Sequence, residues 1–158
     1  MTTLQSTHYS EPLVRPKKFI VSSVSSDAHM WNLVFLQLVL EEQGHEVVNL
    51  GACVPDDVIA EECRRVKPDA LVVSTVNGHG HIDGLRLIQK LRAESDLADL
   101  RVVIGGKLGI RGHDNVAFQE QLVSAGYDGV FESEAGLDEF ERFVRILEPR
   151  RTLAEVAA

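Results

Sequence analysis

The stretch that decides the fold runs from residue 19 to residue 29 and reads Phe19-Ile20-Val21-Ser22-Ser23-Val24-Ser25-Ser26-Asp27-Ala28-His29. Its first part is a short apolar run of the kind that forms a buried strand, and small polar residues then indicate a loop. A carboxylate two positions before a histidine can accept the Nδ1–H of its ring, which fixes the tautomer and raises the basicity of Nε2. The pattern therefore suggests His29 as a metal ligand that is oriented by Asp27.

The composition of the chain is that of one globular domain. It has 158 residues, of which 44% are hydrophobic and 25% are charged, and this length buries a sufficient core without staples. The net charge of -8 argues against nucleic acid or an anionic membrane as a partner, because both need a basic surface. No apolar run approaches the ~20 residues that span a bilayer, and no signal peptide is visible, so we expect a cytoplasmic protein. Cys53 and Cys63 lack the spacing of a metal motif and are predicted to be reduced thiols.

Strand-like and helix-like runs alternate along the chain. This alternation predicts a flavodoxin-like (Rossmann-like), doubly wound α/β fold with a five-stranded parallel sheet in the order 2-1-3-4-5. The domain is expected over residues 17–149, between a disordered N-terminal arm at 1–16 and a C-terminal tail at 150–158. The expected strands are 19–24, 46–50, 70–75, 101–104 and 129–131. Helices are expected over 30–43 and 114–125, between Pro55 and Pro68, around the apolar residues of 82–91 and around those of 137–147.

Three further expectations concern burial. The helix over 30–43 is apolar almost all round, which predicts deep burial. The helix over 82–91 carries an apolar stripe at Ile82, Leu85, Ile88 and Leu91, which predicts one buried face. His45 and His113 are predicted to be surface loop residues.

Candidate site residues follow the first, third and fourth strands. In doubly wound folds, ligands bind at the carboxyl ends of the strands, where the connections diverge. The three loops begin at Ser25, at Ser74 and at Gly105, and glycines such as Gly105 and Gly106 allow a ligand to approach the backbone closely. Taken alone, the glycine pair also fits a tight turn, and Ser74 fits a strand-end hydroxyl bonded to its own backbone. His79 and His81 fit a solvated loop better than a second metal site.

These motifs resemble those of the cobalamin-binding domain family, which carries DxHxxG, SxL and GG in the same three loops. Residues 27–32 match the first motif with Asn32 in place of the glycine, residues 74–76 match the second with Val76 in place of leucine, and residues 105–106 match the third. The intervals of 41 residues between Asn32 and Ser74, and of 28 between Val76 and Gly105, also fit the family. Within it, the chain is most similar to the small subunits of glutamate mutase, which are free-standing cobalamin domains.

The resemblance implies a role for each matching residue. His29 would coordinate cobalt and displace the dimethylbenzimidazole of the cofactor, whose nucleotide tail would enter the core between the first and third strands and contact Ser74. Lys107 would lie near the polar linkage of the tail, and Asn32 could either be accommodated or shift the loop. No catalytic residue is implied in this chain. The implied cofactor-binding residues are Ser26, Asp27, Ala28, His29, Met30, Ser74, Thr75, Val76, Gly105, Gly106, Lys107 and Leu108.

The function that the resemblance implies is that of the cobalamin-binding subunit of an adenosylcobalamin-dependent carbon-skeleton mutase, an isomerase that interconverts L-glutamate and threo-3-methylaspartate. The sequence shows no second domain and no arginine cluster to clamp a dicarboxylate, so activity is expected only with a catalytic large subunit, a barrel in the family. The alternatives are a stand-alone corrinoid carrier for methyl transfer, a cobalamin sensor and a phospho-receiver domain. A receiver needs an acceptor aspartate where this chain has Ser74.

Overall fold

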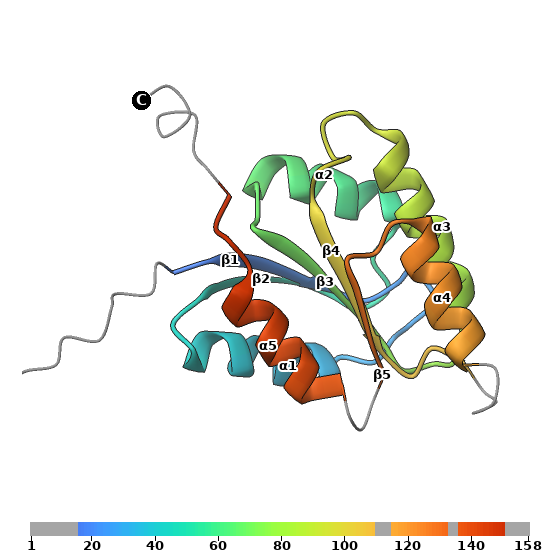
Figure 1. Ribbon diagram of the computed structural model, residues 1–158, viewed down its shortest axis with the longest axis horizontal. Coiled ribbons are helices and arrows are strands. Elements are labelled where there is room, and N and C mark those ends of the chain that lie inside the picture. Colours follow the sequence, from blue (N-terminus) through green and yellow to red (C-terminus); the bar gives the residue numbers. More distant parts are fainter. Residues whose placement is uncertain (1–15, 110–114, 133–135, 151–158) are drawn as a thin grey trace, which may run out of the picture.

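The computed structural model describes residues 16–109, 115–132 and 136–150. They form a five-stranded, fully parallel sheet in the order β2-β1-β3-β4-β5 (Figure 1), which confirms the predicted fold class. The strands are β1 (Lys18–Ser22), β2 (Glu46–Gly51), β3 (Ala70–Thr75), β4 (Arg101–Gly106) and β5 (Gly129–Glu132). The helices are α1 (Trp31–Glu42), α2 (Asp56–Val66), α3 (Gly80–Ala93), α4 (Asn115–Ala125) and α5 (Gly136–Ile146).

Helices cover both faces of the sheet. Because successive side chains of a strand point to opposite faces, Phe19 and Val21 of β1 belong to the apolar core under α1 and α5, whereas Ile20 belongs to the larger core under α2, α3 and α4. Figure 1 shows α1 and α5 together on one side of the strands. We call the two sides the α1–α5 layer and the α2–α4 layer.

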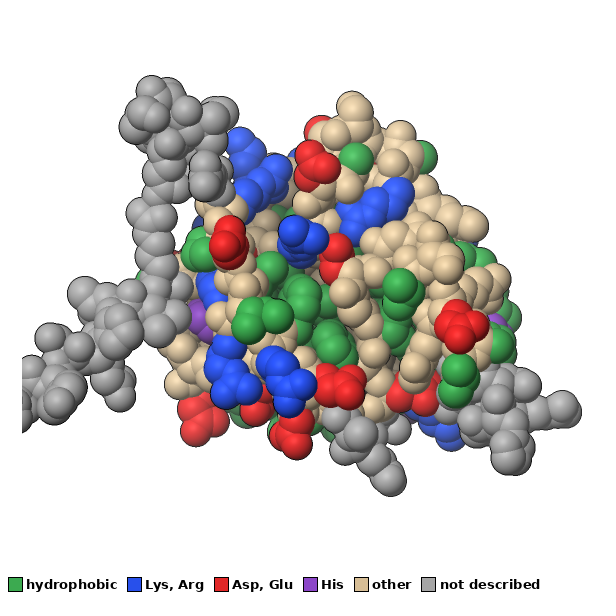
Figure 2. Space-filling model, in the orientation of Figure 1, with side chains coloured by type: hydrophobic (Ala, Val, Ile, Leu, Met, Phe, Trp, Pro, Cys, Tyr) green, Lys and Arg blue, Asp and Glu red, His purple; other side chains and the backbone are tan. Residues whose placement is uncertain are grey.

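Helix α1 is less buried than its sequence predicts. Leu33 and Leu40 are fully buried, but Trp31 is 65% and Leu38 is 59% exposed, and Val34 and Phe35 are exposed too. The prediction of deep burial was wrong because no described element packs on the outer face of this layer. Its apolar character therefore continues onto the surface. Elsewhere, Figure 2 shows acidic and basic side chains interspersed on one face of the molecule, around a hollow with hydrophobic side chains.

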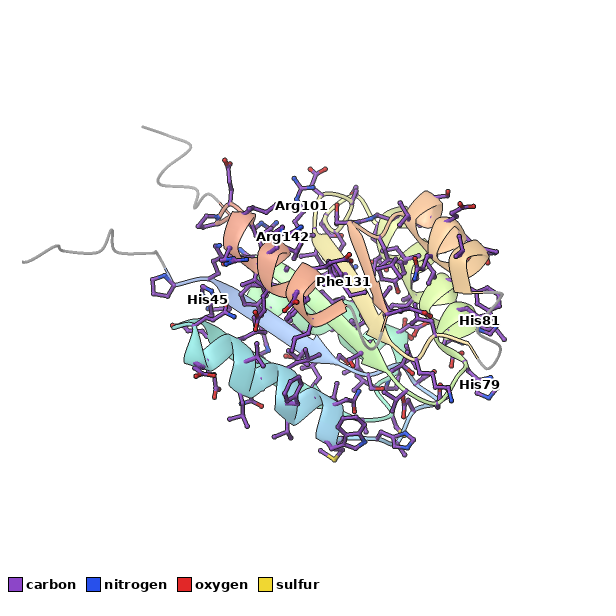
Figure 3. The ribbon with its side chains drawn as sticks, turned by 60° about the horizontal axis from the view of Figure 1, so that its bottom comes forward. His45, His79, His81, Arg101, Phe131 and Arg142 are labelled. Carbon is purple, nitrogen blue, oxygen red and sulfur yellow. The ribbon has the colours of Figure 1, made fainter. Side chains whose placement is uncertain are left out.

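Two other burial predictions need correction. The buried face predicted for α3 is confirmed at Ile88 and Leu91, which are buried, and at Leu85, which packs against the core, but Ile82 is exposed. His45 is only 8% exposed, and Figure 3 shows it at the opposite end of the molecule from His79 and His81. His113 and nearly all of the predicted arm and tail lie outside the described residues. Among the described helices, none has the length and apolar character that a membrane span requires.

Candidate cofactor site

The three predicted loops meet at the carboxyl edge of the sheet. Strands β1 and β3 are neighbours, but α1 leads from β1 outward to β2, while α3 leads from β3 in the other direction to β4. The two connections diverge, so this is the switch point at which doubly wound sheets bind their ligands. The register of β3 with β4 places Ser74 beside Gly105 and Thr75 beside Gly106.

Asp27 is the polar centre of this edge. Its side chain is 0% exposed, and each carboxylate oxygen takes two contacts. One oxygen accepts the backbone N–H of His29 at 2.9 Å and lies 2.6 Å from its ring Nδ1. The other accepts the Thr75 hydroxyl and the Val76 backbone N–H, both at 2.7 Å. Burial alone would raise the pKa of the Asp27 carboxyl, but these hydrogen bonds from His29, Thr75 and Val76 outweigh it and lower the pKa to about 2.

The contact with Asp27 orients the His29 ring and leaves its Nε2 able to bind a metal. A carboxylate that faces Nδ1 holds the proton there and leaves the Nε2 lone pair for coordination. The His29 side chain is 51% exposed, so a large group can reach it. Within the described residues, no group of three or more His, Cys, Asp or Glu side chains could hold a metal ion. A single imidazole ligand fits a metal whose other positions are filled by a macrocycle.

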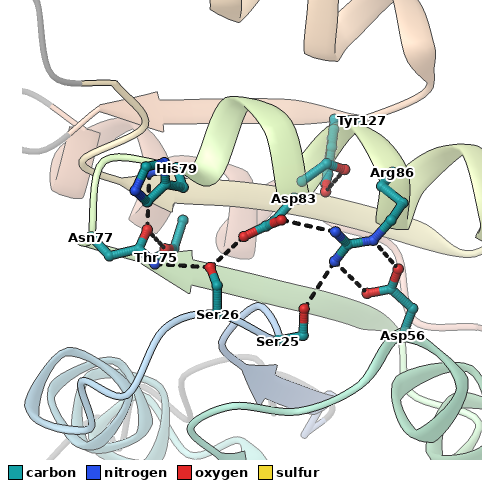
Figure 4. Close-up of polar contacts among 10 residues, drawn as sticks. Ser25, Ser26, Asp56, Thr75, Asn77, His79, Asp83, Arg86 and Tyr127 are labelled. Atoms are coloured by element: carbon teal, nitrogen blue, oxygen red, sulfur yellow. Dashed lines mark hydrogen bonds and ion pairs between the residues drawn. The ribbon is translucent and has the colours of Figure 1, made fainter.

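The loop that carries His29 is tied to α2 and α3 by side chains shown in Figure 4. The Ser26 hydroxyl donates to Asp83 and accepts from Asn77 Nδ2 at 2.9 Å. Arg86 donates to Asp83 at 2.8 Å, to Asp56 at 2.8 Å and to the Ser25 hydroxyl at 2.9 Å. Sequence reasoning missed Arg86, because its partners lie far away in the chain. These contacts hold the loop that carries His29 in place.

A cavity of about 180 Å³ opens beside this loop in the α1–α5 layer. Such a volume admits a flat ring system, since an engineered cavity of about 150 Å³ holds benzene. Most of its walls are apolar, and they include the exposed Trp31 and Phe35 of α1. The lining residues are Trp31, Asn32, Phe35, Leu36, Val72, Val73, Ser74, Val76, Val103, Ile104, Gly105, Gly106, Phe131, Glu132, Gly136, Leu137 and Phe140.

The two glycines of the third motif are required by the sheet itself. A Cβ on Gly105 would lie 2.6 Å from the Phe131 carbonyl oxygen, and one on Gly106 would lie 2.1 Å from the Thr75 carbonyl oxygen. Gly106 also has φ +102°, which side chains rarely adopt. The absence of these side chains leaves the backbone of β4 bare where it lines the cavity.

Asn32, which stands where the motif has glycine, turns inward and is 5% exposed. Its Nδ2 donates to the hydroxyl of buried Ser74 at 2.9 Å, and its Oδ1 has no hydrogen-bond partner among the described residues. Buried polar atoms are nearly always paired, so an orphaned acceptor at a cavity wall suits a polar ligand. Together with the bare β4 backbone and the oriented His29, this arrangement fits a corrinoid with a heterocyclic tail.

The remaining predicted residues lie at different places around this edge of the sheet. Ala28 and Met30 are exposed beside His29. Val76 lines the cavity, and the backbone N–H of exposed Lys107 donates to the Thr75 carbonyl at 2.8 Å. Leu108 is buried in the α2–α4 layer, away from the cavity, and its carbonyl contacts the ring of His81.

Comparisons with known proteins agree with this geometry. A family model described as B12 binding domain matches residues 17–133. "Glutamate mutase sigma subunit 1" of Haloarcula marismortui is 30% identical over 82% of this chain and 85% of its own length. "Glutamate mutase sigma subunit" of Fusobacterium nucleatum is 27% identical over 78% of this chain and 90% of its own.

Solved structures show the same fold. A cobalamin-binding protein from Desulfitobacterium hafniense superimposes with a TM-score of 0.66 at 24% identity, over 83% of this chain and 59% of its own. A putative response regulator from Chloroflexus aurantiacus reaches 0.63 at 18% identity, over 84% of this chain and 98% of its own. Both likenesses concern the fold alone. Since the matching family model spans most of the chain and all three site loops, the chain belongs to the B12-binding domain family and is related to glutamate mutase sigma subunits.

Proposed function

We propose that this chain is the cobalamin-carrying subunit of an adenosylcobalamin-dependent carbon-skeleton mutase and that His29 would bind the cobalt of the cofactor. The observation that carries the proposal is the exposed His29 ring, held by buried Asp27 at 2.6 Å, beside a cavity that admits a flat base. When bound, the cofactor supplies the radical chemistry.

Each part of the site has a task in this proposal. His29 Nε2 would bind the metal, and Asp27 would hold the ring in the coordinating tautomer. Thr75 and the Val76 N–H keep Asp27 ionised from its far side. The cavity in the α1–α5 layer would take the tail of the cofactor. The exposed residues Ala28, Met30 and Lys107 would face the corrin ring.

The reaction that we propose is the interconversion of L-glutamate and threo-3-methylaspartate, because the curated relatives named above are glutamate mutase sigma subunits. The substrate site belongs to a separate catalytic subunit with a barrel fold. The cavity described here does not suit a dicarboxylate, since its lining residues include no lysine or arginine. Two carboxylates would be left without a cationic partner inside an apolar wall.

The test is the electron paramagnetic resonance spectrum of the chain bound to cobalamin in its Co(II) form, with the protein labelled with ¹⁵N-histidine. The parent chain is expected to show superhyperfine coupling to one ¹⁵N nucleus, and His29→Ala is expected to lose this ¹⁵N coupling. Asp27→Asn is expected to stay folded and to bind cobalamin about 10–100-fold more weakly, the usual cost of losing the partner of a metal-bound histidine.

His79→Ala is the matched control, because His79 is an exposed histidine of the same edge that does not contact Asp27. It should keep both the coupling and the affinity. Coupling that survives unchanged in His29→Ala would refute the assignment of the ligand, and a parent chain that binds no corrinoid would refute the proposed function as a whole.

A further inference from the structure

The inner wall of the cavity carries a pair of polar side chains that the cobalt ligand does not explain. Asn32 of α1 and Ser74 of β3 are 5% and 4% exposed, and both line the cavity. They are joined by the hydrogen bond from Asn32 Nδ2 to Ser74 Oγ at 2.9 Å. The remaining wall next to them is formed by apolar side chains such as Phe35 and Val72.

This pair presents one acceptor and one donor. Asn32 Oδ1 has no partner among the described residues, so it accepts. Ser74 Oγ already accepts from Asn32, and a hydroxyl has a single hydrogen to give, so Ser74 is left to donate. The two groups lie within one hydrogen bond of each other. Together they complement a ring edge on which an amino group stands beside a ring nitrogen.

We propose, on the basis of the proposed function, that Asn32 and Ser74 select the base of the cofactor's nucleotide tail. They favour an aminopurine over dimethylbenzimidazole. An aminopurine offers the donor that Asn32 Oδ1 lacks and the acceptor that the Ser74 hydroxyl lacks. An asparagine amide recognises the same kind of edge on adenine in DNA. Dimethylbenzimidazole has two methyl groups and no hydrogen-bond donor, so it leaves the buried Oδ1 unpaired.

The selection follows from the cost of an unpaired buried group. A site built to hydrogen-bond a ligand discriminates against an analogue that lacks the group, because its own polar atoms stay desolvated. In this chain the discriminating atom comes from Asn32, which replaces the glycine of the motif. With a glycine at position 32, this part of the cavity wall would keep the Ser74 hydroxyl but would lack the amide.

The test compares the dissociation constants of three corrinoids, measured with the purified chain by the change in the visible spectrum on coordination. They are cobalamin, the cobamide with an adenine base, and cobinamide, which has no nucleotide tail. We expect the parent to bind the adenine cobamide about tenfold more tightly than cobalamin, as one net hydrogen bond predicts. This preference should disappear in Asn32→Ala and shrink in Ser74→Ala, while the affinity for cobinamide stays unchanged in both.

Asn49→Ala is the matched control. Asn49 of β2 also bonds through its side chain, to Gln37 and to the Gly51 N–H, but it does not line the cavity. Its replacement should leave the preference intact. Equal affinity of the parent for both bases, or a preference that persists in Asn32→Ala, would overturn the inference and leave the proposed function standing. A parent that does not coordinate even cobinamide would overturn both.

Discussion

Asp27 shows how much a single residue of this site depends on tertiary contacts. The pairing of its carboxylate with His29 is local and readable from the sequence, because the two residues are two positions apart. Its second oxygen is bound by Thr75 and Val76, which follow a different strand. Those donors lower the pKa of Asp27 and keep the carboxylate a pure acceptor, which is the state that holds the His29 proton on Nδ1.

His45 is a second residue whose state was decided by distant groups. Its Nδ1 accepts a hydrogen bond from the backbone N–H of Lys17 at 3.1 Å, so this nitrogen carries no proton and the ring is neutral. Burial lowers the pKa of His45, Lys17 lowers it further, and Asp69 acts in the opposite direction. The prediction of a surface position failed because Lys17 and His45 are 28 residues apart in the chain.

We therefore expect His45 to make folding pH-dependent. In the unfolded chain a histidine has a pKa of about 6.5. The folded-state pKa lies below this value, so the unfolded state binds more protons as the pH falls through about 6.5, and the free energy of unfolding decreases. The parent should lose stability between pH 7 and pH 5 more steeply than His45→Gln, by up to about 1.4 kcal/mol per pH unit.

Urea denaturation of the two proteins across this pH range measures the difference, in which the contributions of the shared carboxylates cancel. Parallel curves for the parent and His45→Gln would show that the histidine titrates alike in the folded and unfolded states.

Among the elements, α1 departs most from its sequence pattern. Its run of apolar residues gives no strong periodicity, so the sequence could not show which side faces the sheet. The sheet contacts decide it: Leu33 and Leu40 pack in the α1–α5 layer, whereas Trp31 and Leu38 face outward. In α3 the apolar pattern did predict the buried face, and only Ile82 departs from it by being exposed.

Two leucines of α1 test which side of the helix is buried. Leu40→Ala is expected to lower the free energy of unfolding by about 2–5 kcal/mol, because it leaves a cavity in the core. Leu38→Ala should change it by no more than about 0.5 kcal/mol, the usual range for surface substitutions.

Chemical denaturation of both variants, with the parent as reference, provides the comparison. Equal losses in Leu38→Ala and Leu40→Ala would mean that the outer face of α1 is covered in solution.

For the whole molecule, the decisive feature is that the cavity in the α1–α5 layer lies at the carboxyl edge of the sheet, the edge that also carries the exposed His29 ring. In the proposed function, the chain uses this cavity for the cofactor tail and His29 for the metal. It offers no cationic clamp for a dicarboxylate in that cavity. A radical reaction also needs a closed, water-free chamber, which an exposed edge does not supply.

We accordingly expect the isolated chain to show no interconversion of L-glutamate and 3-methylaspartate, and turnover to begin when a cognate catalytic subunit is added. The measurement is product formation with the chain alone, with the large subunit alone and with both, each in the presence of adenosylcobalamin. Turnover by the isolated chain would contradict the two-subunit proposal. No turnover with any such partner would favour the corrinoid-carrier alternative.

The sequence by itself determined the alternation of strands and helices, the strand order, the family and the loop positions of His29, Ser74 and Gly105. These features depend on local periodicity and on motif spacing, which a chain carries without being folded. It also placed β3 at the observed residues 70–75, because a short, valine-containing apolar run bounded by loop residues favours a strand over a helix.

Only the tertiary structure decided the buried face of α1, the neutral state of His45, the Arg86 contacts to the His29 loop and the inward turn of Asn32. Each of these depends on pairs of residues separated by many positions, such as Asn32 with Ser74 and Arg86 with Ser25. Hydrogen bonds and burial between distant segments form only when the sheet brings them together, and no local pattern in the sequence encodes them.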